Sequence, residues 1–261
     1  MLLNQLRGFS KLFWALGLVS LGLFMAPNPA KAATLIPLKS QDANPGFDDF
    51  DFRALINNGD FTELFVAEGR IGNNSTGTGE RELGINTATG ANVDPGNFAW
   101  GNAKVWDFNL EYTGSQVTFK VFDANQTIQL SQAFSGPVTD IYFRTFAQKG
   151  NNNNLQNALS LTDLVFNGVS IGSLASASTS TTADVDYFRL GKISTPFTLT
   201  GKTSMSWVGT APSRSNLAFQ IKVGTSKSVP EPSVLGAIFG VTIAGATAVK
   251  RKKAAIQQVE I

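Results

Sequence analysis

The feature that most constrains the fold is an alternation of apolar and polar residues with a period of two. It is clearest in residues 117–121 (VTFKV) and 217–223 (LAFQIKV), where every second residue is apolar. Successive side chains of a strand point to opposite faces, so this period predicts half-buried β-strands. Other short runs rich in aromatic and β-branched residues predict further strands, over residues 61–66, 104–112, 128–134, 141–146, 161–166, 185–190, 197–200 and 204–208.

Turn residues separate these runs. Asn167-Gly168 lies between two apolar triplets and suits a type I′ hairpin, because both residues tolerate positive φ. Asn58-Gly59 predicts another turn, and the only helix we expect is a turn or two within residues 51–57. Small polar stretches predict loops at 71–80, 150–154 and 175–182. Many short strands without a helical repeat predict an all-β, antiparallel β-sandwich or jelly-roll-like extracellular domain.

The first 32 residues have the three parts of a secretory signal peptide. Arg7 and Lys11 make a positive start, residues 12–25 are uncharged and apolar, and Ala30 and Ala32 form an A-x-A cleavage signature before Ala33. We therefore expect cleavage before Ala33 and export of the rest of the chain.

The C-terminal region predicts one transmembrane helix. Residues 234–249 carry no charge and are followed at once by four basic residues, Lys250, Arg251, Lys252 and Lys253. Sixteen uncharged residues are near the lower limit for a membrane-spanning helix. Basic residues stay on the cytoplasmic side, which would place the exported residues before position 234 on the opposite side of the membrane, outside the cytoplasm.

Composition excludes several kinds of chemistry. The chain has no cysteine and no histidine, which excludes Ser-His-Asp and Cys-His nucleophilic sites, thiolate zinc sites and imidazole metal ligands. The expected mature region, 33–229, has 14 Lys and Arg against 17 Asp and Glu, a net charge of −3. The +2 of the whole chain therefore comes from its ends, and a mildly acidic domain is not expected to bind nucleic acid.

The tail as a whole resembles the PEP-CTERM sorting signal, a bacterial tail processed by a membrane protease-transpeptidase called exosortase. Pro230, Glu231 and Pro232 match the motif, directly before the apolar segment and the basic stop. The two prolines also favour an extended backbone, as a protease substrate needs. The resemblance implies exosortase as a partner, a membrane-anchored precursor, and association with exopolysaccharide or the outer surface. A plain C-terminal membrane anchor is the alternative.

The mature region more loosely resembles the choice-of-anchor domains, type W being the nearest. The likeness lies in its Asn-, Gly- and Thr-rich strands, in FTLTG at 197–201, in MSW at 205–207, and in its place before the tail. The expected organisation is a signal peptide (1–32), a β-sandwich domain (33–223), a linker (224–229), a sorting and anchor tail (230–253) and a cytoplasmic extension (254–261).

Aspartates near the start of the mature region are the candidate metal ligands. Asp48, Asp49 and Asp51, with Asp42 nearby, could hold Ca²⁺ in an extracellular module. The calcium-loop pattern is absent, and a solvated acidic loop is the main interpretation. Asp184 and Asp186 share one face of an expected strand. We expect this face to be exposed to solvent, and a Ca²⁺ site is the alternative. We expect no other cofactor.

Aromatic residues are the candidate sugar platform. Trp106 shares strand parity with Phe108 and Leu110, which favours burial, whereas Trp100 lies in a loop-like sequence and is the candidate for an exposed stacking ring. We therefore expect a non-enzymatic exported surface or matrix protein with a structural or adhesive role in exopolysaccharide or biofilm, and without catalytic residues of its own. The alternatives are a carbohydrate-binding module, and a glycoside hydrolase that uses two of the 17 carboxylates.

Overall fold

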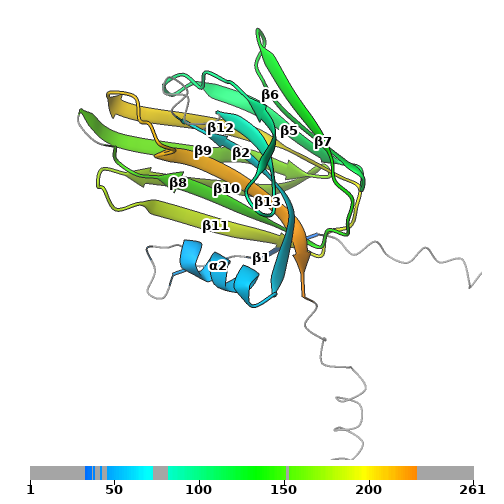
Figure 1. Ribbon diagram of the computed structural model, residues 1–261. Helices are drawn as coiled ribbons and strands as arrows, with labels where there is room; N and C mark the ends of the chain where they lie inside the picture. The colour runs from blue at the N-terminus through cyan, green and yellow to red at the C-terminus, as the bar shows by residue number, and fades with distance from the viewer. Residues whose placement is uncertain are drawn as a thin grey trace, which may run out of the picture. The chain divides into compact units, whose positions relative to one another are not determined.

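The computed structural model describes residues 33–36, 38, 42, 46–72, 82–150 and 153–227. These residues form 13 strands in two antiparallel sheets, with one short α-helix (Figure 1). The expected all-β antiparallel sandwich is confirmed. The predicted signal peptide, the Pro230-Glu231-Pro232 motif and the apolar segment at 234–249 lie outside the described residues. Within the described ranges, no helix is both long and apolar enough to cross a membrane.

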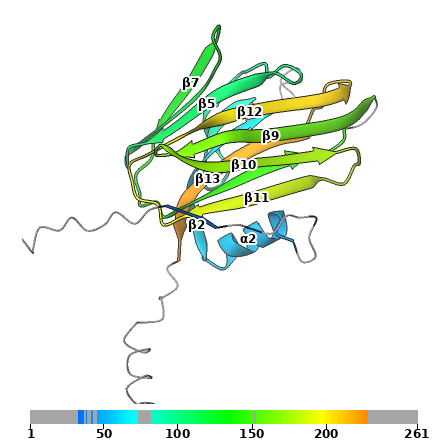
Figure 2. The same cartoon turned by 180° about the vertical axis from the view of Figure 1, so that it is seen from behind.

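Seven strands form sheet A and six form sheet B. Sheet A has the order β1-β11-β8-β13-β2-β3-β4 and sheet B the order β10-β9-β12-β5-β6-β7. Figure 2 shows β5, β12, β9 and β10 of sheet B running side by side. The strand bounds are β1 Thr34–Ile36, β2 Phe61–Arg70, β3 Leu83–Thr87, β4 Asn92–Gly96, β5 Val105–Tyr112, β6 Gln116–Phe122, β7 Thr127–Ala133, β8 Asp140–Ala147, β9 Asn154–Phe166, β10 Val169–Ser178, β11 Asp184–Gly191, β12 Phe197–Gly209 and β13 Leu217–Ser226.

The main core fills the space between the sheets. In β5, Trp106, Phe108 and Leu110 alternate with partly exposed residues and are at most 1% exposed. Leu110 is paired with Phe119 of β6 in the strand register, so neighbouring strands present apolar side chains to the same face. Each such side chain, fully buried, contributes about 1.5–3 kcal/mol. With no disulfide available, this burial has to supply the stability of the domain.

Helix α2 (Asp49–Asn57) covers part of the outer face of sheet A and creates a second core. Phe52 of the helix packs against Phe61, Tyr142 and Tyr187, with ring centroids 5.2–5.7 Å apart. This contact explains why Tyr142 is buried although its neighbours in β8, Ile141 and Phe143, face the main core on the other side of the sheet. Both faces of sheet A are covered there, one by sheet B and the other by α2 (Figure 1).

Both predicted Asn-Gly turns are confirmed. Phe166 pairs with Val169 across Asn167 and Gly168, whose φ angles are 47° and 83°. Asn58 caps the end of α2, and Gly59 follows with a φ of 70°.

The predicted loop at 175–182 is wrong in its first half. Ser176 and Ser178 belong to β10, which pairs with β9 as far as Ser178 and Asn157. Both serine side chains are buried, and their hydroxyls bond to Thr145 and to backbone carbonyls. Local polarity was therefore a poor guide to exposure here.

The last strand of the domain is longer than predicted. Strand β13 continues through Ser226, three residues past the expected domain boundary at Val223.

Candidate functional site

The acidic cluster lies at the start of α2, where two of its members cap the helix. Asp48 is the N-cap, and its Oδ1 accepts hydrogen bonds from the backbone N–H groups of Phe50 (2.6 Å) and Asp51 (3.3 Å). Asp51 Oδ2 in turn accepts from the Asp48 N–H at 3.0 Å, which completes a capping box. These carboxylates satisfy backbone donors that a helix end leaves unpaired.

Asp49 fastens the helix to sheet A. Arg144 of β8 donates two hydrogen bonds to its two carboxylate oxygens, both at 2.7 Å, and Tyr187 of β11 donates a third at 2.7 Å. Burial alone would raise the pKa of Asp49, but the hydrogen bonds and charge of Arg144 outweigh it and hold that pKa below its usual value. Burial, above all, raises the pKa of Tyr187.

A hollow of about 300 Å³ lies beside this contact. Asp49, Arg144 and Lys222 in its lining are in ion pairs. Arg53, also in the lining, donates from its Nε to the Asp49 backbone carbonyl at 3.1 Å. Lys222 donates to Glu63 at 3.2 Å and lies over the Phe52 ring, 4.7 Å from its centroid. In the part of the chain that the structure describes, no group of three His, Cys, Asp or Glu residues is placed to hold a metal ion. The bonds that Asp49 accepts from Arg144 and Tyr187 attach α2 to sheet A.

The prediction of an exposed ring at Trp100 is wrong. Trp100 is only 3% exposed, and its indole N–H lies within hydrogen-bond distance of the carbonyls of Arg70 (3.0 Å) and Glu82 (3.1 Å). Its ring fits against Gly69 of β2, where an added Cβ would lie 2.5 Å from the Trp100 ring. A glycine inside a strand can mark such a close approach. Gly69 was therefore the sequence signal for the burial of Trp100, and the loop-like sequence around Trp100 gave no such signal. The expected burial of Trp106, 1% exposed, is confirmed.

Asp184 and Asp186 connect the two sheets along one side of the sandwich. Asp186 accepts a hydrogen bond from the Ser176 hydroxyl at 3.0 Å, and Asp184 accepts from the Ala177 N–H at 2.6 Å. Both carboxylates thus reach from β11 in sheet A to β10 in sheet B, and both residues are half-buried. Burial raises the pKa of Asp184, and the neighbouring charge of Asp186 adds to the effect.

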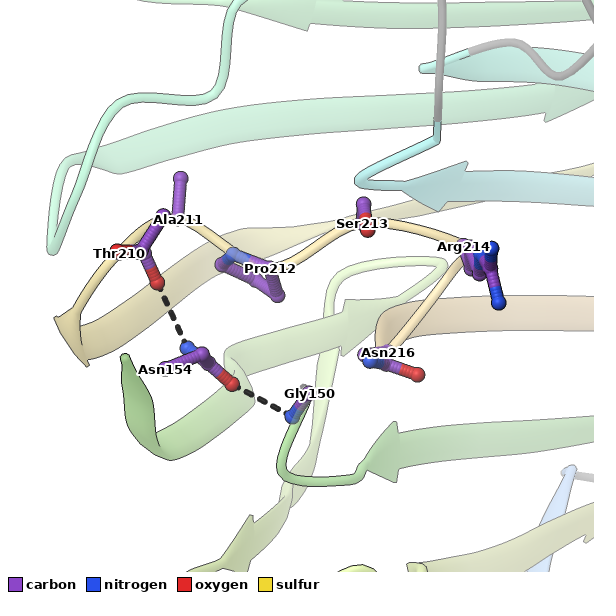
Figure 3. A pocket seen from close by; sticks show the side chains of 8 residues that line it. All are labelled: Gly150, Asn154, Thr210, Ala211, Pro212, Ser213, Arg214 and Asn216. Atoms are coloured by element: carbon purple, nitrogen blue, oxygen red, sulfur yellow. Dashed lines mark hydrogen bonds between the residues drawn. The ribbon is translucent and has the colours of Figure 1, made fainter. Parts of the chain in front are cut away.

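The structure also contains a polar hollow at one end of the sandwich that sequence reasoning missed. We call it the end hollow. It has a volume of about 230 Å³ and lies between two connections that cross from one sheet to the other, the β8–β9 and β12–β13 loops (Figure 3). Its lining residues are Gly150, Asn154, Thr210, Ala211, Pro212, Ser213, Arg214 and Asn216.

Asn154 makes a rigid wall of the end hollow. It is 1% exposed, and its side-chain oxygen accepts from the Gly150 N–H at 2.6 Å, as Figure 3 shows. Its amide nitrogen donates to the Thr210 carbonyl at 2.9 Å and to the Asn157 side chain at 2.8 Å. The amide of Asn154, at the start of β9, therefore bonds to both connecting loops.

Four other side chains of the end hollow are available to a ligand. Among the described residues, the side chains of Thr210, Ser213, Arg214 and Asn216 have no hydrogen-bond or ion-pair partner. Of the described residues that line the hollow, Arg214 alone is ionisable. The hollow thus offers one unpaired cation together with hydroxyl and amide groups.

The turn that carries Arg214 is strained. Asn216 N–H donates to the Ser213 carbonyl at 3.1 Å, and the two central residues, Arg214 and Ser215, have φ angles of 56° and 59°. These are the features of a type I′ turn, which strongly favours Asn-Gly. A residue with a larger side chain costs roughly 1–2 kcal/mol in each left-handed position. Within the described residues the buried Ser215 hydroxyl also lacks a hydrogen-bond partner.

Most of the sequence-predicted processing residues lie outside the described residues. This holds for Ala30, Ala32, the sorting motif Pro230-Glu231-Pro232 and the basic run from Lys250 to Lys253. Ala33 is described: it packs against the main core, immediately before β1. Comparison with known proteins finds no family model and no curated protein that matches the chain.

Proposed function

We propose that the chain is a non-enzymatic, exported surface or matrix protein, sorted by an exosortase and adhesive through its β-sandwich. The sorting part of the proposal rests on the sequence: a signal-peptide pattern ending at Ala32, the Pro230-Glu231-Pro232 motif, the uncharged apolar segment at 234–249 and the basic residues after it. The adhesive part rests on the fold.

The observation that carries the adhesive role is the placement of the two ends of β13. The end hollow immediately precedes Leu217, the first residue of this strand, whereas the chain continues into the tail after its last residue, Ser226. Ten residues of strand separate the two points by roughly 33 Å. A domain tethered through its C-terminus would therefore carry its unpaired polar groups at the end remote from the tether.

The position of β13 within sheet A also suits a tether. The strand lies between β8 and β2, so it is hydrogen-bonded on both sides. Further bonds hold its two ends, from Ile71 N–H to the Leu217 carbonyl (3.0 Å) and from Thr139 N–H to the Gly224 carbonyl (2.9 Å). Tension on the tail would therefore act on a strand that is bonded to two neighbours, which resists separation better than an edge strand bonded to one.

A carbohydrate-binding module is the second candidate, and the end hollow favours it. The free hydroxyl and amide groups of Thr210, Ser213 and Asn216 are of the kind that hydrogen-bond to sugar hydroxyls. This candidate describes how the domain would adhere, and it is compatible with surface display.

Surface retention tests the proposed function. We expect cells that express the full chain to keep it at their surface, and cells that express a chain ending at Lys227 to release it into the medium with its fold intact. The matched control replaces Pro230, Glu231 and Pro232 with alanine, which should retain the protein in an unprocessed form. Retention of the truncated chain inside the cell, or equal release of all three forms, would contradict the proposal.

A further inference from the structure

The end hollow combines properties that a purely structural loop does not need. Arg214 and Ser215 occupy the two positions where a type I′ turn accepts Asn-Gly most easily. The same chain does use Asn-Gly in its β9–β10 hairpin, at Asn167 and Gly168. Residues that strain the backbone cluster at sites that bind ligands, because there a particular side chain must occupy a particular position.

The side chain held in this position is an unpaired guanidinium group. Arg214 is exposed and, within the described residues, has no carboxylate partner, unlike Arg144 and Arg189, which form ion pairs with Asp49 and Asp140. Among the residues that the structure describes, no acidic residue lines the hollow. The fork of a guanidinium group fits a carboxylate with two parallel hydrogen bonds, so the unoccupied partner is expected to be an anion of that geometry.

The rest of the hollow indicates a sugar. Its volume of about 230 Å³ is below the range of sites for drug-sized ligands, which start at about 300 Å³, and suits a single ring. Thr210 and Ser213 offer hydroxyl groups and Asn216 offers an amide, all free to bond to ring hydroxyls. The oxygen and the nitrogen of the Asn154 amide already have partners, so this residue fixes the shape of the hollow.

We propose that the end hollow binds the carboxylate of a uronic acid, with Arg214 as the carboxylate ligand and Thr210, Ser213 and Asn216 as partners of the ring hydroxyls. This inference rests on the proposed function, since it names the chemistry of the surface to which the domain adheres. It also explains the strained turn: the fold gives up an easier Asn-Gly turn in order to present a cation there.

The test titrates the full chain, in a mild non-ionic detergent, with an oligomer of galacturonic acid and with the matching neutral oligomer of galactose. The decisive variant is Arg214→Asn/Ser215→Gly, which restores the preferred turn and so removes the cation without harming the fold. We expect its Tm to rise by about 4–8 °C, because strain is relieved in both left-handed positions. Its affinity for the acidic oligomer should fall by roughly 10–100-fold, as loss of a charge-assisted hydrogen bond implies.

Lys192→Asn is the matched control. Lys192 also has a left-handed backbone, with a φ of 58°, and it follows β11 outside the lining of the hollow. This variant removes the same charge and relieves the same kind of strain, and we expect unchanged affinity. Arg214→Lys keeps the charge but loses the fork, so it should bind the acidic oligomer more weakly than the native chain.

The possible failures separate the inference from the proposed function. Equal binding of both oligomers, unaffected by the turn variant, would overturn the role of Arg214 and leave an adhesive carbohydrate-binding domain. Competition by acetate as effective as by galacturonate would reduce the site to a general anion site and overturn the sugar assignment. No binding of either oligomer by a chain that passes the surface-retention test would overturn the inference alone.

Discussion

At the scale of residues, the three carboxylates at the start of α2 have different tasks. Asp48 and Asp51 lie three positions apart and bond to each other's backbone N–H groups, a local pattern that the sequence already contains. Asp49 instead bonds to Arg144 and Tyr187, which are 95 and 138 residues away in the chain. No local pattern identifies such partners, which is why the cluster could be predicted to be acidic but not to fasten a helix.

Replacing Asp49 tests its role directly. Asp49→Asn removes the charge opposite Arg144, whose side chain is only 12% exposed. Breaking a fully buried pair costs about 3–5 kcal/mol. Asp49 is 34% exposed, so solvent screening reduces the effect, and we expect a loss of about 2 kcal/mol in the free energy of unfolding, measured by urea at pH 7.

The same variant predicts a pH dependence. The folded pKa of Asp49 is below its unfolded value of 3.8, so its stabilising effect is present above that value and is lost as the pH falls through the folded pKa. The difference between the native chain and Asp49→Asn should therefore be constant near neutral pH and shrink below about pH 4. A difference that does not change at acidic pH would contradict the assignment of the lowered pKa to Asp49.

At the scale of elements, the period-two pattern predicted most strands but not where each ends. Residues 197–200 and 204–208 form one continuous strand, β12, because Gly201 remains in the sheet and leaves room for Leu164 and Phe108. Three strands were missed: β1 is only three residues long, and the sequences of β3 and β4, LGINT and NVDPG, contain glycine, proline and few apolar residues. Pairing with neighbouring strands, and not local propensity, sets their conformation.

Gly69 in β2 gives a prediction at this scale. An added Cβ would lie 2.5 Å from both the Phe219 and Trp100 rings, which are buried and cannot easily move. Glycine to alanine normally favours a strand, but here we expect Gly69→Ala to lower the free energy of unfolding by about 1–3 kcal/mol. Tryptophan fluorescence in a urea titration would follow both the unfolding and the displaced Trp100 ring.

Gly136→Ala is the control for this substitution. Its Cβ would meet the end of the Leu64 side chain at 3.1 Å, and a flexible leucine can give way. We expect little change in stability. A Gly69→Ala chain as stable as the native one would show that the Trp100 ring does not occupy the space above Gly69.

At the scale of the whole molecule, the sequence could predict two sheets but not their connections. The alternation in β13 shows which residues face the core, yet not that this strand lies between β8 and β2. The end hollow depends on that order, because Asn154 and Thr210 meet there across 56 positions of sequence. Its polar side chains come from the start of β9 and from the β12–β13 loop, neither of which carries a recognisable motif by itself.

The central claim is that this domain is exported, cleaved from its signal peptide and processed by an exosortase at its C-terminal tail. The most direct test is to detach the protein from the cell surface and to measure its intact mass. We predict a product that begins at Ala33 or Thr34 and ends between Val229 and Ser233, and a tail that stays uncut in Glu231→Ala. Recovery of the released native protein with residues 234–261 still attached would contradict the account and leave a simple membrane anchor.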